Sequence, residues 1–203
     1  MKKIYILIFI IFSCNKIEDL PNSSIQYPEI GKIIPHVQIN TLNKEIVDEP
    51  KISSKMIITK DSMILYDGNI GIEYRGSSSQ LFDKKSYGFE TWDEENEDMD
   101  YPLLGFPEEE DWIFYGPYSD KTLIRNKLIY DLSNQIGRYA SRTKFCELTI
   151  NNQYMGVYVF MEKLKRDKNR IAIKKLENDD LDSINISGGY IIKIDKSDNE
   201  NGE

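Results

Sequence analysis

Histidine and cysteine are scarce in this sequence. Its 203 residues include one histidine, His36, and two cysteines, Cys14 and Cys146. A single histidine cannot support a serine-histidine-acid arrangement unaided, and no cluster of histidine and cysteine offers the ligands of a zinc site. Hydrolase functions of those kinds are therefore disfavoured. Cys146 lies in an apolar pattern at residues 145–150, and we expect a small core residue there, not a nucleophile.

The sequence also lacks any excess of positive charge. The 26 lysines and arginines are outnumbered by 34 aspartates and glutamates, which gives a formal net charge of -8. Acidic residues gather at 93–100, 108–111 and 177–182, where they would repel a phosphate backbone. Nucleic acid is therefore not an expected partner. The length and the 40% hydrophobic content predict one domain, and no internal repeat is visible.

The N-terminus carries the features of a bacterial export signal. Two lysines precede an apolar run at residues 4–12 that is too short to span a bilayer. The run ends at Ser-Cys14, which resembles the lipobox of lipoproteins, whose cysteine is acylated. We expect a signal peptide at 1–13 and a tether at 14–29, so that the exported protein is anchored at the outer membrane or cell surface. The alternatives are an ordinary cleaved signal or a short buried strand, with Cys14 incidental.

Alternation of apolar and polar residues predicts a mostly β-structured first third of the chain. Residues 75–80, RGSSSQ, interrupt this alternation with a tight loop between two strands. Residues 151–153, Asn-Asn-Gln, favour a hairpin turn between two later strands. Strands are expected at 33–39, 56–58, 69–74, 85–89, 144–150, 154–161, 171–173 and 189–195, and a short helical turn at 103–112.

One segment has a clear helical pattern, at residues 121–136. Apolar residues recur at four-residue steps from Ile124 to Ile136, which predicts an amphipathic helix. Ser119 or Asp120 is placed to cap its start, and Gly137 to end it.

Five stretches together resemble one known family. The first is the strand-rich entry around Pro35, and the others are GIEYRGSSSQLFDKKSYGFE (71–90), LLGFPEEEDWIFYGPYSDKTLIRNKLIYDL (103–132), FCELTINNQYMGVYVFMEKLKRDKNRI (145–171) and GGYIIKID (188–195). In order and spacing they resemble the CotH family, which is named from a spore-coat protein and includes atypical secreted protein kinases. The resemblance covers residues 30–196. One departure lies in the loop, which has serine after the glycine where relatives usually carry asparagine.

The resemblance implies an α+β fold. It places a β-rich, kinase-like N-terminal lobe with one main amphipathic helix, at about 121–136, before an incomplete C-terminal lobe. The CotH kinase-like domain then spans residues 30–196, and residues 197–203 are expected to be a disordered end.

The resemblance also implies phosphoryl transfer from ATP, with Mg²⁺, to serine or threonine of a protein or another surface acceptor. The family's catalytic and magnesium-binding aspartates follow the 188–195 strand, and the chain ends eight residues after Asp195. We therefore expect this truncated chain to bind nucleotide weakly at most and to transfer no phosphate. The alternatives are a non-catalytic adhesion or scaffold lipoprotein at the cell surface, and a fragment that does not fold stably.

The candidate phosphate-binding residues fall first in the loop and the strand after it. Arg75, Gly76, Ser77, Ser78 and Ser79 offer small side chains, backbone N–H groups and hydroxyls, as phosphate-facing elements do, although a serine-rich turn is usually only a turn.

A basic pair, Lys84 and Lys85, follows where the family carries one, and an ammonium there could reach phosphate oxygens. Neighbours on a strand face opposite ways, so only one should enter a cleft, and which one stays open. The plain alternative is two exposed lysines on an edge strand.

Two further candidates lie on later elements. Arg125, in the predicted helix, is placed to hold a loop or a phosphate against the first turn, or else belongs to a solvated face. Glu162 ends a hydrophobic strand, and by kinase analogy it lies near the adenine or pairs with the lysine. A charge at the end of a strand is also common at a solvent-facing edge. No metal ligands are assigned in this chain.

Overall fold

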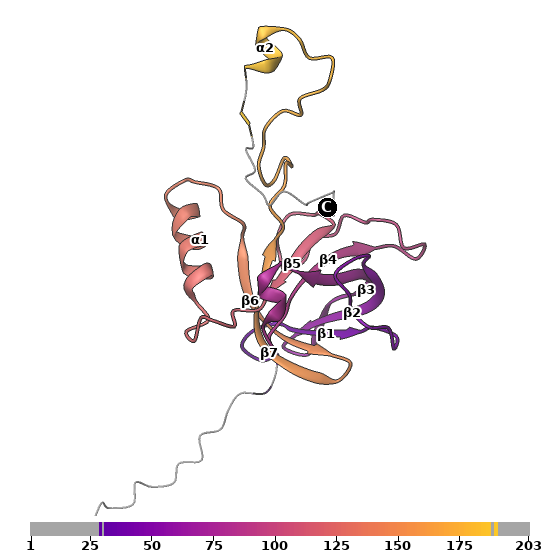
Figure 1. The fold of residues 1–203 in the computed structure, drawn as a ribbon. Coiled ribbons are helices and arrows are strands. Elements are labelled where there is room, and N and C mark those ends of the chain that lie inside the picture. Colours follow the sequence, from indigo (N-terminus) through magenta and orange to yellow (C-terminus); the bar gives the residue numbers. More distant parts are fainter. Residues whose placement is uncertain (1–28, 30, 188, 191–203) are drawn as a thin grey trace, which may run out of the picture.

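The structure, a computed structural model, describes residue 29, residues 31–187 and residues 189–190. Seven strands form a closed barrel in the order β1-β2-β3-β4-β5-β7-β6 (Figure 1). The predicted signal peptide, Cys14, the disordered end and most of the strand predicted at 189–195 lie outside the described residues. The strands are β1 His36–Asn40, β2 Ile52–Lys60, β3 Met63–Arg75, β4 Ser86–Trp92, β5 Asp111–Tyr115, β6 Thr143–Ile150 and β7 Gln153–Glu162.

The barrel closes through one parallel pairing, between β1 and β6. Val37 lies opposite Leu148 in this pair, whereas all the other neighbouring strands are antiparallel. The predicted α+β kinase-like lobe with an incomplete second lobe is therefore wrong: the described residues form a closed β-barrel accompanied by one 11-residue helix and short helical turns. Strand patterns reveal local periodicity, but they do not reveal that residues more than a hundred positions apart pair and close a sheet.

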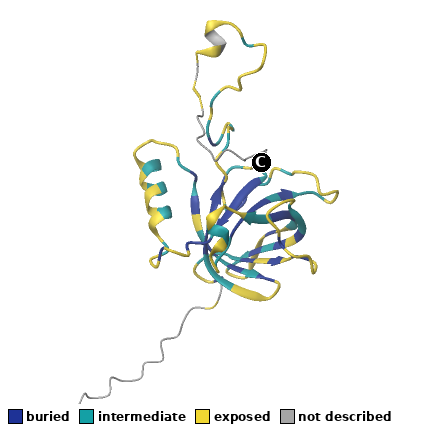
Figure 2. Ribbon diagram, in the orientation of Figure 1, coloured by how far each residue is buried: buried dark blue, intermediate teal, exposed yellow. Residues whose placement is uncertain are grey.

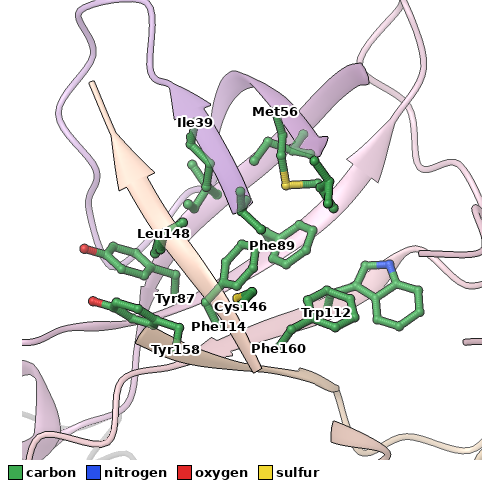
Figure 3. Close-up of a cluster of buried hydrophobic side chains, with 14 of the residues drawn as sticks. Ile39, Met56, Tyr87, Phe89, Trp112, Phe114, Cys146, Leu148, Tyr158 and Phe160 are labelled. Carbon is green, nitrogen blue, oxygen red and sulfur yellow. The ribbon is translucent and has the colours of Figure 1, made fainter. Parts of the chain in front are cut away.

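The hydrophobic core fills the inside of this barrel. Alternate side chains of each strand point inward, and Figure 3 shows the aromatic rings of β4, β5 and β7 in contact there. Phe89 stacks on Phe114 with 4.5 Å between ring centroids, and Trp112 on Phe160 with 5.1 Å. Cys146 is fully buried among them, where burial raises the pKa of its thiol. Its predicted role as a small core residue is confirmed.

The helical turn predicted at 103–112 is wrong: a tight turn with positive φ angles at Leu104 and Gly105 lies there, the rest is loop, and strand β5 begins at Asp111. The first four residues of β5, from Asp111 to Phe114, are all buried, so this strand shows no alternation of apolar and polar residues. A short buried strand without such alternation cannot be distinguished from other buried segments by periodicity. The hairpin predicted at 151–153 is confirmed, because β6 and β7 pair and both Asn151 and Asn152 have positive φ angles of 48° and 64°.

The helix α1, Arg125–Gln135, is shorter than predicted, and the side of it that carries the apolar residues does not face the core. Residues 121–124 are not helical, and Leu123 has a φ of 63° that no helix allows. The apolar stripe faces outward: Leu128 and Leu132 are 53% and 45% exposed. Figure 2 shows no buried segment along α1. Gly137 follows the helix with a φ of 79°, as expected for the glycine that ends it.

After β7 the chain leaves the barrel. An isolated bridge between Arg166 and Ile171 is the only β-structure there among the described residues, and a short helix α2, Ser183–Ile186, lies in an arm that projects away from the strands (Figure 1). Within the described part of the chain, no helix is long and apolar enough to cross a membrane.

Candidate functional site

The loop between β3 and β4 folds back on itself at one end of the barrel. Gly76 has a φ of 110°, and a Cβ there would collide with the Ser79 hydroxyl, so the position requires glycine. A 3-10 turn, Ser78–Leu81, follows. The Gln80 side-chain amide donates to the Gly76 carbonyl at 2.7 Å and to Asp48 at 2.6 Å. The loop therefore has a defined shape in which Gly76 and the serines Ser77, Ser78 and Ser79 lie close together.

Lys84 reaches from this loop across the end of the barrel core. Its ammonium donates to the Met155 carbonyl at 2.8 Å and lies 4.0 Å from the centroid of the Tyr158 ring. Burial lowers the pKa of Lys84. No carboxylate pairs with it in the described part of the chain. The ammonium is thus half-buried, held by neutral groups, and retains donors for an anion.

Lys85 is held inside its own loop. Its ammonium donates to the Gln80 carbonyl at 2.6 Å, and it also makes no ion pair with the described residues. The backbone of Lys85 meets a second loop, because a Cβ on Gly116 would lie 2.5 Å from the Lys85 carbonyl oxygen and 3.2 Å from Cγ of Lys84. Gly116 also donates its N–H to the Ser86 hydroxyl at 3.0 Å. The loops before β4 and after β5 therefore fix both lysines at the same end of the barrel.

A pocket of about 270 Å³ lies beside Met155, the residue whose carbonyl accepts the hydrogen bond of Lys84. Met155 lines it together with Tyr74 and Tyr87. The two tyrosine rings lie 5.7 Å apart, and burial raises the pKa of Tyr87 to about 12. Figure 3 shows Tyr87 and Tyr158 side by side, with their hydroxyls pointing away from the rest of the core. Aromatic faces thus lie next to a cation at this end.

Arg125 lies at the start of α1, after the loop that contains Gly116. Its guanidinium is 3.4 Å from Asp120 and its side chain is 73% exposed. Asp120 also accepts the backbone N–H of Arg125 at 2.9 Å and the Thr122 hydroxyl at 2.6 Å. The hydrogen bond from Thr122 lowers the pKa of Asp120. Arg125 therefore has a carboxylate partner, unlike the two lysines, and no described contact joins it to the β3–β4 loop.

Glu162 lies at the other end of the barrel. It is seven residues further along β7 than Met155, a separation of roughly 23 Å at about 3.3 Å per residue. Its carboxylate, 1% exposed, accepts a bond from the Arg142 guanidinium at 2.5 Å and from the Arg142 backbone at 2.8 Å. Arg170 is 3.8 Å away. The structure therefore does not bring Glu162 together with Lys84 or Lys85.

This far end holds an ion-pair network that the sequence reasoning missed. Arg170, buried over Trp112, pairs with Glu109 and donates to the Asp111 carbonyl at 2.7 Å. Lys165 contacts Glu109 at 2.6 Å and Asp111 at 2.8 Å. The sequence carried a signal for it, because the acidic run at 108–111 is complementary to the basic run at 163–170.

Three carboxylates at this end, from Asp100, Glu109 and Glu110, are close enough to one another to hold a metal ion. Lys165 already contacts Glu110 at 2.7 Å as well as Glu109. The cluster is therefore neutralised by the protein's own cations, and we assign it a structural role.

Fold and loop together define a small β-barrel protein with a lysine-bearing loop across one end. A family model described as CotH kinase protein matches residues 72–202, which is more than half of the chain. The protein therefore belongs to the CotH family, and the resemblance seen in the sequence is confirmed. The match begins within β3 and includes the loop, both lysines, Arg125 and Glu162, whereas β1 and β2 lie outside it.

One curated relative is similar over much of the chain. The inner spore coat protein H of Bacillus subtilis (strain 168) is 27% identical over 138 residues, which cover 68% of this chain and 34% of that protein. The aligned part thus spans about a third of the relative's length.

Proposed function

We propose that the chain is a nucleotide-binding module of a CotH-type kinase, in which Lys84 contacts the phosphates of ATP. The main observation behind this proposal is the half-buried ammonium of Lys84. It donates to a carbonyl oxygen and has no carboxylate partner among the described residues, although the protein has a formal charge of -8. An isolated buried cation is costly, and a bound anion removes that cost. The membership of a family described as kinase supports phosphate as that anion.

The neighbouring residues suit the rest of a nucleotide. The loop adds Arg75, Lys85 and the serines 77–79, whose charges, N–H groups and hydroxyls complement phosphate oxygens. The pocket beside Met155 offers Tyr74 and Tyr87 as aromatic contacts for a base. Arg125 and Glu162 are not needed in this arrangement, because each already has an oppositely charged partner.

The remaining elements of the proposed activity go beyond this site. We propose that Mg²⁺ takes part only as the counter-ion of bound ATP. The carboxylate cluster found among the described residues, Asp100, Glu109 and Glu110, lies at the opposite end of the barrel and is not placed to hold a metal ion beside the phosphates. Transfer of the γ-phosphate to a serine or threonine hydroxyl of a protein or polymer acceptor is the reaction we propose for the kinase to which this module belongs, and for this chain we propose nucleotide binding alone. The proposed location is the cell surface, through a lipid on Cys14, which the N-terminal sequence and the spore-coat relative support.

Calorimetric titration of the purified chain with ATP and Mg²⁺ tests the proposal. Lys84→Met should weaken binding at least tenfold, because it removes the ammonium from the phosphates while keeping the apolar stem over Tyr158. Lys55→Met, on the exposed side of β2, is the matched control and should bind as the unmodified chain does. Equal affinity of all three proteins would contradict the role of Lys84.

Two other results would redirect the functional assignment. Absence of any ATP binding would contradict the nucleotide-binding proposal and favour the adhesion or scaffold alternative. Incorporation of label from γ-labelled ATP, dependent on Mg²⁺, would show transfer by this chain and overturn the expectation that it binds without turnover.

A further inference from the structure

A second candidate binding site lies on the outside of the barrel, away from Lys84. This groove has a volume of about 570 Å³, within the range of about 300–1,000 Å³ typical of small-molecule sites. Residues of the segment before β1, of β2, β3, β6 and α1, and of the β4–β5 loop line it. We call it the β6 groove. None of the residues proposed to contact ATP lines it.

The walls of the β6 groove are largely apolar. Ile33, 68% exposed, and Leu65, 39% exposed, are large hydrophobic side chains turned to solvent here. Phe145, on the outer face of β6, and Leu104 extend the apolar surface. Apolar walls in a concave site indicate a ligand with an apolar body, because filling the groove removes that surface from water.

The charged groups of the groove are all positive. Lys60, Lys127 and Lys144 line it, and among the described residues no aspartate or glutamate does, although the whole chain is acidic. Lys127 pairs with Asp131 at 2.7 Å, and Lys144 donates to the Leu104 carbonyl. The Lys60 ammonium makes no hydrogen bond or ion pair with any described residue. Lys60 is therefore the cation with the most capacity for an external anion.

We propose that the β6 groove binds a single-chain amphipathic anion, such as a medium-chain alkyl carboxylate. The aliphatic chain packs against Ile33, Leu65 and Phe145, and the carboxylate pairs with Lys60. The charge of the lining favours an anionic head over a neutral or cationic one, since the described lining residues include three lysines and no carboxylate. The inference is independent of the ATP site.

The test is calorimetric titration of the full chain with decanoate. Lys60→Gln should weaken decanoate binding at least fivefold, whereas Lys55→Gln, on the same strand but outside the groove, should change it less than twofold. Shortening the ligand should weaken binding about fourfold for each CH₂ removed, because each buried CH₂ contributes about 0.8 kcal/mol. Leu65→Gln provides a second variant that alters the apolar wall and not the charge, and it should weaken binding too.

Decyltrimethylammonium, with the same chain length and the opposite charge, is the matched ligand. It should bind at least tenfold more weakly than decanoate, and ATP should not compete with decanoate. Equal binding of the two ligands would show unspecific uptake by apolar surface, and it would overturn the proposal. Equal weakening by Lys60→Gln and Lys55→Gln would show an effect of general charge, and it would overturn the proposal too. Failure of decanoate to bind at all would overturn it as well.

Discussion

At the residue scale, the candidate ATP site depends on how closely two loops approach each other. Gly116 has no room for a side chain, because a Cβ would lie 2.5 Å from the Lys85 carbonyl oxygen. The backbone there cannot move without displacing Lys84 and Lys85. The same residue that permits the close approach therefore also positions the two cations.

Gly116→Ala should lower the free energy of unfolding by about 1–3 kcal/mol, the usual cost of forcing extra volume into a packed site. It should also weaken ATP binding, because the lysines shift. Gly137→Ala is the control, since a Cβ there meets nothing and only the positive φ opposes it, at a cost of about 1 kcal/mol. Urea denaturation measures both, and a smaller loss for Gly116→Ala than for Gly137→Ala would contradict the packing described.

Arg170 is the most buried cation of the ion-pair network, with its side chain 1% exposed. Arg170→Met should cost about 3–5 kcal/mol of stability, because it leaves buried carboxylates without their partner. Lys168→Met removes an exposed pair with Glu108 at 3.8 Å, and it should change stability by less than about 0.5 kcal/mol. Equal effects of the two substitutions in chemical denaturation would show that the network is not buried as described.

Asp111 makes this network sensitive to acid. Burial alone would raise its pKa, but hydrogen bonds from Lys163 and Lys165 lower the pKa of Asp111 below its ordinary value. A carboxyl whose pKa is lower in the folded state contributes stability above its unfolded pKa, and that stability is lost as the pH falls through the folded pKa.

Lys163→Met should therefore destabilise the protein at neutral pH, and its difference from the unmodified chain should shrink as the pH falls and Asp111 becomes protonated. Melting temperatures between pH 7 and pH 2 check this. A difference that is constant over that range would contradict the role assigned to the Lys163–Asp111 pair.

At the element scale, α1 is unusual because it presents polar residues to the barrel. Lys127 donates to the Thr143 carbonyl at 3.3 Å, and Thr143 donates its hydroxyl to Asp131 at 3.4 Å. The apolar side chains of Leu128 and Leu132 lie on the outside. The helix thus contributes little to the core in the described structure.

Leu128→Ala and Leu132→Ala should each change the free energy of unfolding by less than about 0.5 kcal/mol, as exposed substitutions do. Leu148→Ala, the same substitution inside the barrel at 0% exposure, should cost about 2–5 kcal/mol. Denaturant titration of the three variants checks this. Losses at Leu128 and Leu132 close to that at Leu148 would show that α1 packs its apolar face against the protein.

The elements also show what the sequence could predict. The β6–β7 hairpin was predictable because Asn-Asn tolerates the positive φ angles of a tight turn. The helical pattern located α1, yet its start and orientation were wrong, because the Asp120 contacts and the φ of Leu123 hold residues 121–124 outside the helix. Closure of the barrel depends on the pairing of β1 with β6, a contact distant in sequence that periodicity does not encode.

The candidate site was predictable to a similar extent. The family resemblance located the β3–β4 loop and the two lysines, and the structure places them together at one end of the barrel. It could not reveal that Glu162 lies at the opposite end, because that depends on the direction of β7 in the closed sheet.

At the scale of the whole molecule, the two ends of the barrel differ in charge pairing. At one end the charges of Glu162, Arg170 and their neighbours neutralise one another in ion pairs, and we assign that end a structural role. At the other end the ammonium groups of Lys84 and Lys85 donate to carbonyl oxygens, Lys84 also lies over the Tyr158 ring, and neither lysine forms an ion pair among the described residues. This asymmetry is the physical basis for placing an anionic ligand at the lysine-bearing end.

Labelling with an acyl-phosphate derivative of ATP tests this central claim most directly, since the reagent transfers its acyl group to lysines beside the bound phosphates. The lowered pKa of Lys84 leaves more of its amine unprotonated and reactive. Mass spectrometry should find Lys84 as the main acylated residue, with labelling suppressed by excess ATP. Labelling that ATP does not suppress, or that occurs mainly at lysines away from the β3–β4 loop, would contradict the account.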